Sequence, residues 1–169
     1  RRYMAIKDDT GYTFHRFWLG ITSMHLKPGA NGVGYKAAFY GDEQVQAQVV
    51  GYGYRLWLGE DGQKMIAHKD GSFTSGKTVT ARLQNFDVAN YGEADVNATV
   101  FMQFKNGVSV ESAACSFTLR SLMEQINAAV ATYTDAQMSA LQTMCKNNEA
   151  AMSGWDIANI LNWTATETA

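Results

Sequence analysis

The segment Asn97-Ala98-Thr99-Val100-Phe101-Met102-Gln103-Phe104 carries the clearest structural signal in this 169-residue chain. Its apolar residues Ala98, Val100, Met102 and Phe104 occupy every second position and therefore share one side of an extended chain. Alternation at period 2 is typical of a β-strand with one buried face, because successive side chains point to opposite sides. We therefore predict a strand here, with its apolar face in the core.

The same alternation recurs on both sides of this segment. Residues 78–83 and 52–58 show it clearly, and residues 12–24, 33–40 and 108–119 are further candidate strands. About six or seven strands separated by turns are typical of an antiparallel sandwich. The predicted fold class is mainly β, an immunoglobulin-like antiparallel β-sandwich over residues 1–119.

Turn signals separate the candidate strands. Asp61-Gly62, Asp70-Gly71 and Asn106-Gly107 each predict a tight hairpin, because Gly and Asn tolerate the positive φ that such turns require. Asn106-Gly107 is the strongest of the three, since it lies between two candidate strands. Residues 27–32 predict a longer loop.

The period changes to that of a helix after residue 119. Thr134 with Gln137 predicts a capping box at the start of a helix over about 135–152, ended by Ser153-Gly154. A first helix precedes it, and residues 155–163 predict a short third one. The predicted buried stripe of the middle helix consists of Met138, Leu141, Cys145 and Met152. We expect residues 120–163 to be a helical appendage packed on the sandwich, and 164–169 to be a tail or linker.

Composition excludes several functions. The 14 basic and 16 acidic residues give a net charge of −2 and never form a block, so we expect no nucleic-acid binding. No run approaches the roughly 20 apolar residues of a membrane-spanning helix, so we expect no membrane insertion. Cys115 and Cys145 lack the spacing of a metal site, and whether they are bonded stays open.

One formal motif points to catalysis. Gly71-Ser72-Phe73-Thr74-Ser75-Gly76-Lys77-Thr78 has the glycine, lysine and threonine spacing of the phosphate-binding loop of nucleotide hydrolases. That loop follows a buried strand and opens a helix, whereas the residues after it here alternate as a strand. We therefore expect no enzyme and no cofactor. The alternative is a nucleotide hydrolase that uses this loop, or a fragment of a glycosidase, and a helix that opens at Gly76 would favour the former.

Metal binding has little support either. Asp8-Asp9-Thr10-Gly11 and Glu60-Asp61-Gly62 have oxygen ligands for calcium, but too few for a dedicated site, so turns are the better interpretation. His15, His25 and His68 lie in separate segments without ligand spacing, and we expect His15 to be partly buried with its polar atoms satisfied.

Aromatic residues give the candidate ligand-binding site. Arg55 and Trp57 lie on the strand face opposite Tyr52, Tyr54 and Leu56, and Trp18 shares a face with Tyr12, Phe14 and Arg16. Flat aromatic rings beside hydrogen-bonding groups can hold sugar rings. The candidate residues are Trp57, Arg55 and Trp18. The competing interpretation is that such aromatics belong to the core or are covered by the helical segment.

Five segments together resemble immunoglobulin-like or fibronectin-like accessory modules of multidomain extracellular proteins from gut Firmicutes. They are His25–Ala37, Tyr54–Gly59, Thr80–Asp87, Asn90–Thr99 and Phe117–Met123. The resemblance implies a parent chain that is secreted or attached to the bacterial cell wall. It implies that this module is a non-catalytic spacer or binding unit, with a glycan or cell-surface polymer and other domains of the parent as partners. The helical C-terminus departs from a plain immunoglobulin-like domain.

Overall fold

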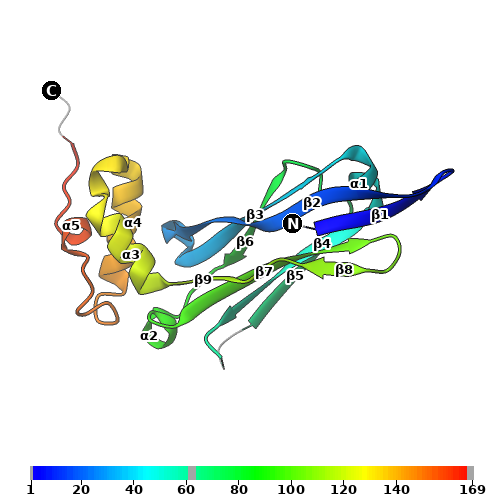
Figure 1. The fold of residues 1–169 in the computed structure, drawn as a ribbon. Coiled ribbons are helices and arrows are strands. Elements are labelled where there is room, and N and C mark those ends of the chain that lie inside the picture. The colour runs from blue at the N-terminus through cyan, green and yellow to red at the C-terminus, as the bar shows by residue number, and fades with distance from the viewer. Residues whose placement is uncertain (1, 61–63, 167–169) are drawn as a thin grey trace.

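The structure is a computed structural model that describes residues 2–60 and 64–166. Two antiparallel sheets pack face to face, as the sequence predicts for a β-sandwich (Figure 1). Sheet A has the order β1-β2-β3-β6, with β1 Arg2–Asp8, β2 Gly11–Lys27, β3 Gly32–Gly41 and β6 Thr78–Leu83. Sheet B has the order β5-β4-β7-β8, and β9 also pairs with β7. Its strands are β4 Val49–Leu58, β5 Lys64–Asp70, β7 Asp95–Phe104, β8 Ser109–Glu111 and β9 Cys115–Thr118.

The predicted inward face of β7 is confirmed. Ala98, Val100 and Met102 are 0% exposed and Phe104 is 4% exposed. Thr99, on the other face, is buried as well, and its hydroxyl donates a hydrogen bond to the Glu111 carboxylate. The alternation therefore identified the core side correctly.

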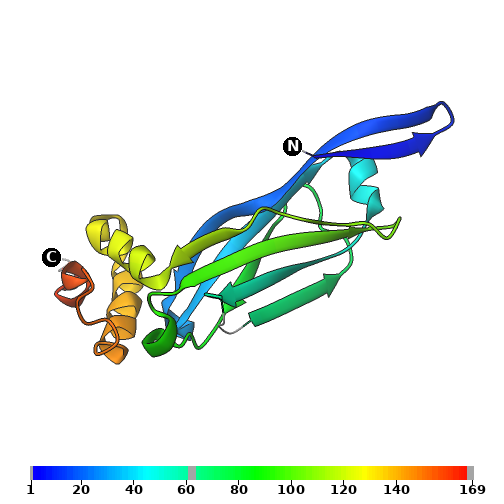
Figure 2. The same ribbon diagram turned by 60° about the horizontal axis from the view of Figure 1, so that its bottom comes forward.

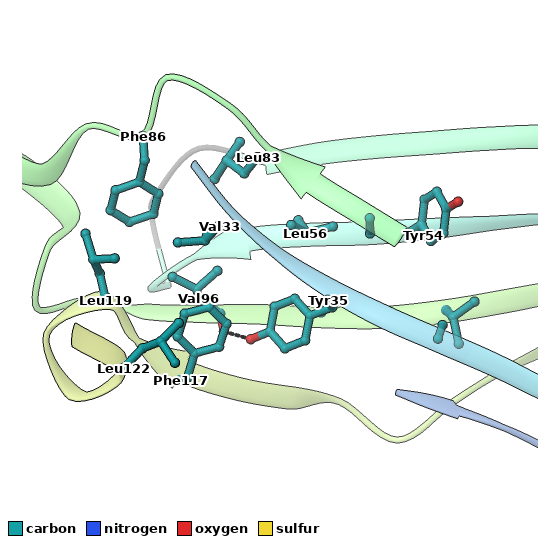
Figure 3. Packing of buried hydrophobic residues seen from close by; sticks show 14 of the residues in the cluster. Val33, Tyr35, Tyr54, Leu56, Leu83, Phe86, Val96, Phe117, Leu119 and Leu122 are labelled. Atoms are coloured by element: carbon teal, nitrogen blue, oxygen red, sulfur yellow. Dashed lines mark hydrogen bonds between the residues drawn. The ribbon is translucent and has the colours of Figure 1, made fainter. Parts of the chain in front are cut away.

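The core between the sheets is mainly apolar, and its most deeply buried tyrosine is Tyr35. Val33 and Tyr35 of β3 face Leu56 of β4 and Val96 of β7 (Figure 3). The Tyr35 hydroxyl donates a hydrogen bond to the backbone carbonyl of Val96, which satisfies a polar group that burial would otherwise leave unpaired. The Tyr35 ring lies 5.1 Å from the ring of Phe117, measured between centroids.

Strand β1 is an element that the sequence analysis missed. It pairs with the first half of β2, and the resulting hairpin extends beyond the rest of the sandwich (Figure 2). Strand β2 is 17 residues long, with a register shift between Ile21 and Ser23 where it pairs with β3. The sequence predicted only the part of β2 from residue 12 to residue 24.

The predicted turns have three different outcomes. Asn106-Gly107 joins β7 to β8, and Gly107 adopts a φ of +82°. Asp70-Gly71 is not a hairpin, because β5 belongs to sheet B and the next strand, β6, belongs to sheet A. Asp61-Gly62 lies outside the described residues. The predicted loop at 27–32 contains a short 3-10 turn, η1 Pro28–Ala30.

Two short helices occur between strands. In α1 (Glu43–Gln48), the Asp42 side chain accepts a hydrogen bond from the Val45 N–H. In α2 (Val88–Tyr91), Asp87 accepts one from the Asn90 N–H in the same way. Both carboxylates satisfy N–H groups that the first turn of a helix leaves free. Neither helix was predicted.

The C-terminal region contains α3 Leu119–Ala128, η2 Val130–Thr132, α4 Asp135–Asn147 and α5 Ala158–Leu161. The capping box is confirmed, since Thr134 accepts from the Gln137 N–H and the Gln137 side chain accepts from the Thr134 N–H. The predicted end of this helix at 152 is wrong. It ends at Asn147, where the Asn148 side chain donates to the Met144 carbonyl. Of residues 155–163, only 158–161 are helical.

The helices lie at one end of the sandwich and not over an outer face of either sheet (Figures 1 and 2). The predicted buried residues Met138, Leu141, Cys145 and Met152 are all buried, and they join the same apolar cluster as the sandwich core. Met152 belongs to the turns after α4 and not to the helix. Both cysteines are free. Within the described residues, no helix has the length and hydropathy needed to cross a bilayer.

Candidate functional site

Arg55 and Trp57 lie on the outer face of sheet B. The neighbouring β4 residues Tyr54, Leu56 and Leu58 are between 1% and 3% exposed and point into the core. Because side chains alternate along a strand, Arg55 and Trp57 point away from the core. The Arg55 side chain is 53% exposed, and Trp57 is half-buried. The predicted pairing of these two residues on one face is therefore what the fold provides.

Strand register determines the neighbours of the pair. Arg55 lies between Ile66 of β5 and Thr99 of β7, which are its partners in the two strand pairs. Trp57 lies between Lys64 and Asn97 in the same way. Directly paired residues share a face of the sheet and are close enough to interact. The face thus combines the apolar side chains of Trp57 and Ile66 with the cations Arg55 and Lys64 and the Asn97 amide.

Glu111 of β8 orients the arginine. Its carboxylate lies 3.4 Å from the Arg55 guanidinium, and its second oxygen accepts a 2.6 Å hydrogen bond from the Thr99 hydroxyl. The guanidinium carbon lies 5.5 Å from the centroid of the Phe101 ring, within range of a cation–π interaction. An ion pair this exposed contributes little to stability, and its relevance here is that Glu111 and Arg55 lie side by side on the outer face.

Phe101 makes this part of the face flat. A Cβ atom on Gly53 would lie 2.4 Å from the Phe101 ring, which shows that the ring lies against the Gly53 backbone. The His68 ring is stacked at an interplanar angle of 17° to it, with centroids 6.0 Å apart. Glycine is required at this strand position, because a Cβ atom would also lie 2.6 Å from the backbone carbonyl oxygen of Ala67, which cannot move aside as a ring can.

A surface hollow of about 310 Å³ opens beside the pair. Its walls include Arg55, Trp57, Lys64, Ile66 and Glu111, all from β4, β5 and β8. That volume is at the lower end of the roughly 300–1,000 Å³ found for small-molecule sites. None of these walls comes from a helix, so the helices do not close this hollow. The guanidinium of Arg55, the ammonium of Lys64 and the carboxylate of Glu111 line the hollow together with apolar side chains. This arrangement is suited to hydrogen bonding with a polyhydroxylated ring.

Trp18 does not join this site. It lies on β2 of sheet A, between the buried residues Phe17 and Leu19, and points to the outer side of that sheet. The outer faces of two packed sheets point in opposite directions. The three candidate residues therefore form two separate surfaces, with Arg55 and Trp57 on one and Trp18 on the other.

Phe101 and Glu111 are site residues that the sequence analysis did not identify. Both lie in candidate strands on either side of Asn106-Gly107, and the structure pairs them directly. Finding them requires the correct register of this hairpin, which the sequence does not give. The two-residue turn expected at Asn106-Gly107 would pair residue 105 with 108. Residue 111 would then lie opposite Met102, on the core side, whereas the structure places it on the outer face.

The segment Gly71–Thr78 does not have the surroundings of a phosphate-binding loop. It connects β5 to β6, and its last residue, Thr78, begins a strand. No helix therefore starts at Gly76 to direct its N–H groups at a phosphate. The geometric basis for the nucleotide-hydrolase alternative is thus missing at this segment.

Metal-ligand groups are also dispersed. Among the described residues, no three His, Cys, Asp or Glu side chains are close enough to hold a metal ion. The Asp8 carboxylate is used locally, since it accepts hydrogen bonds from Thr10 and Thr13 as expected for a turn. His15 Nδ1 lies 2.6 Å from an Asp42 carboxylate oxygen, whereas its buried Nε2 has no partner among the described residues. His15 is thus only partly satisfied.

No known protein family matches this chain, and no curated protein matches it. The function is therefore inferred from the surfaces described above.

Proposed function

We propose that this chain is a non-catalytic binding module and that the hollow beside Trp57 binds a sugar ring. The observation that carries the proposal is the pairing of Trp57 with Arg55 on an uncovered sheet face. An indole beside a guanidinium supplies a stacking surface for the ring and donors for its hydroxyl groups. Lys64 and Glu111, on the walls of the hollow, supply a further donor and an acceptor.

The proposal extends to the parent protein. We take the sandwich, residues 1–119, to be an immunoglobulin-like module of a bacterial surface or secreted protein, extracellular or attached to the cell wall. In this proposal the helices of residues 120–163 are an appendage that connects the module to other domains. The resemblance of five segments to such accessory modules supports this assignment. If the module has no ligand, it is a spacer between those domains.

A single stacked ring contributes about 1 kcal/mol, so we expect weak binding with a dissociation constant on the order of millimolar. A glycan array probed with the isolated chain identifies the sugar, and calorimetric titration with that oligosaccharide measures the affinity. Trp57→Ala should abolish the binding, and Arg55→Ala should weaken it. Val108→Ala is the control, because it removes an exposed apolar side chain outside this hollow. Binding that survives Trp57→Ala, or an array without any hit, would contradict the proposal.

A further inference from the structure

The outer face of sheet A exposes an unusual number of large aromatic rings. They are Tyr3 (60% exposed), Tyr12 (68%), Phe14 (71%), Trp18 (42%) and Tyr40 (51%). Scattered exposed apolar side chains are normal, but a contiguous group of them marks an interaction site. This group is distinct from the hollow beside Trp57, which lies on sheet B.

Strand register shows that the rings are contiguous. Tyr12 pairs with Lys7, and Tyr3 pairs with Arg16 across β1 and β2. Trp18 pairs with Tyr40 across β2 and β3, and their ring centroids are 6.0 Å apart. Because directly paired residues share a face, these side chains form one surface that runs along the projecting hairpin onto the body of the sheet.

Trp18 lies flat on this surface. A Cβ atom on Gly20 would be 2.5 Å from the Trp18 ring, so the indole covers the Gly20 backbone and leaves its other side to the solvent. A ring held in this way is a ready stacking platform that loses little further freedom when a ligand binds.

The charges on this face have a single sign. Lys7, Arg16, Lys36 and Arg82 are exposed and occupy outward positions of β1, β2, β3 and β6. In these four strands, no described residue at an outward position is acidic. None of the four cations forms an ion pair with a described residue. Residues that are far apart in the sequence are thus collected into a basic surface on a chain whose net charge is −2.

The cations also affect His25, which lies at the end of the face near the helices. Burial lowers the pKa of His25, and the nearby cations Lys27, Lys36 and Arg82 lower it further. His25 pairs with Gly34 on the same outward side as Arg82.

We propose that the outer face of sheet A binds a linear acidic polysaccharide, with sugar rings stacked on the aromatic side chains and carboxylate groups paired with the cations. An anionic ligand follows from the charge of the face, and a polymer follows from its length. The occupant is not a second copy of the chain joined through this face, because that arrangement would bring the four cations of each copy against those of the other.

The spacing of the cations favours a polysaccharide over a nucleic acid. Lys7 is paired with Tyr12, four residues before Arg16, which places these two cations about 13 Å apart along the strand. Lys36 is paired with Ser23, about 20 Å beyond Arg16. Arg82 lies close to Lys36, because Lys36 is paired with Thr80, two residues before Arg82. The four cations therefore occupy three positions along the face. A nucleic acid has a phosphate on every nucleotide, so the long intervals between these positions would leave phosphates without a cation. A polysaccharide with carboxylates on spaced sugars fits the observed intervals.

Oligohyaluronate, a linear chain in which a uronic acid alternates with an uncharged sugar, is the probe for calorimetric titration at low ionic strength. Its methyl ester is the matched ligand, since it keeps the rings but loses the charges. Phe14→Ala and Arg16→Ala should each weaken the binding about 3- to 10-fold, and added salt should weaken it further. Both residues are exposed, so melting curves should show that the variants remain folded. Lys105→Ala removes an exposed cation outside the face and should leave the affinity unchanged.

The proposal is overturned by any of four results. They are no saturable binding of oligohyaluronate, equal binding of its methyl ester, tighter binding of oligo-dT, and concentration-dependent dimerisation abolished by Phe14→Ala. Oligo-dT binding would mean a nucleic-acid surface, and dimerisation would mean a second copy. Trp57→Ala separates this proposal from the proposed function: it should not affect oligohyaluronate binding, and either site can fail without the other.

Discussion

The hydroxyl of Tyr35 in β3 donates a hydrogen bond to the backbone carbonyl oxygen of Val96 in β7 and thereby links the two sheets through the core (Figure 3). Tyr35 is 0% exposed, so water cannot replace this bond. Tyr35→Phe keeps the ring but removes the donor, and it should lower the free energy of unfolding by about 1–2 kcal/mol. Urea denaturation measures the loss. Tyr40→Phe is the control, because the exposed Tyr40 should change stability by less than about 0.5 kcal/mol.

The free energy of unfolding should fall at alkaline pH, because three buried groups have raised pKa values. Burial raises the pKa of Tyr35 and of Tyr54 above the ordinary value of 10.0, and raises the pKa of the Cys145 thiol from 9.0 to about 11. In each case the unfolded chain releases its proton at lower pH than the native protein does. The stabilisation is therefore complete below about pH 9 and is lost as the pH rises through the native-state values.

Urea midpoints measured between about pH 8 and about pH 11 test this dependence. The midpoint of the wild-type protein should fall over this range. In Tyr35→Phe it should start lower and fall less steeply, because the group with the largest shift is gone. Parallel slopes in the two proteins would show that Tyr35 does not contribute to the alkaline loss.

The sequence predicted the β7 side of the core because one strand face alternates cleanly. It also predicted the start of α4, because the capping box of Thr134 and Gln137 is a local feature. It missed β1, where Tyr3, Ala5 and Lys7 face outwards and only Met4 and Ile6 face the core. Local sequence patterns were therefore sufficient to predict elements with a clear buried face or a cap. They were insufficient for β1, an edge strand whose formation depends on pairing with β2.

The candidate sites show the same limit. Alternation along β4 predicted correctly that Arg55 and Trp57 share a face. Glu111 belongs to the site only because a three-residue loop joins β7 to β8, with the Gly107 N–H donating to the Phe104 carbonyl. A loop shorter by one residue would turn the Glu111 side chain to the other face of the sheet. The basic face of sheet A depends on which strands become neighbours, so the absence of a charged block in the sequence did not reveal it.

Cys145 should react with thiol reagents much more slowly than Cys115. Cys145 is 0% exposed, its Sγ lies 3.7 Å from the Met123 sulfur, and burial raises its pKa to about 11. The thiolate is the reactive form, so burial and the raised pKa both slow the reaction. Ellman's reagent should label one thiol per chain in the native state and two in urea. Rapid native labelling of both thiols would mean that α4 is not docked.

Packing of α4 is tested by a charge in its buried stripe. Met138 is 0% exposed, so Met138→Asp places a carboxylate in an apolar cluster without a partner. We expect a loss of about 4 kcal/mol or more, with a much lower melting temperature or no cooperative unfolding. Ser139→Asp adds the same charge at the next, exposed position and should have little effect. Equal melting curves for the two variants would contradict the docked arrangement of the helix.

The flat position of Trp18 depends on the missing side chain at residue 20. A Cβ atom there would be 2.5 Å from the indole, so Gly20→Ala must move the ring away from the sheet. Because the ring is the end of a movable side chain, the cost in stability should stay within about 1 kcal/mol. Its exposure should rise, with stronger quenching of tryptophan fluorescence by acrylamide. Gly29→Ala is the control, since nothing lies within 4 Å of the position of its Cβ. In a Trp18→Phe background the quenching change should disappear, and its persistence there would show that another tryptophan responds.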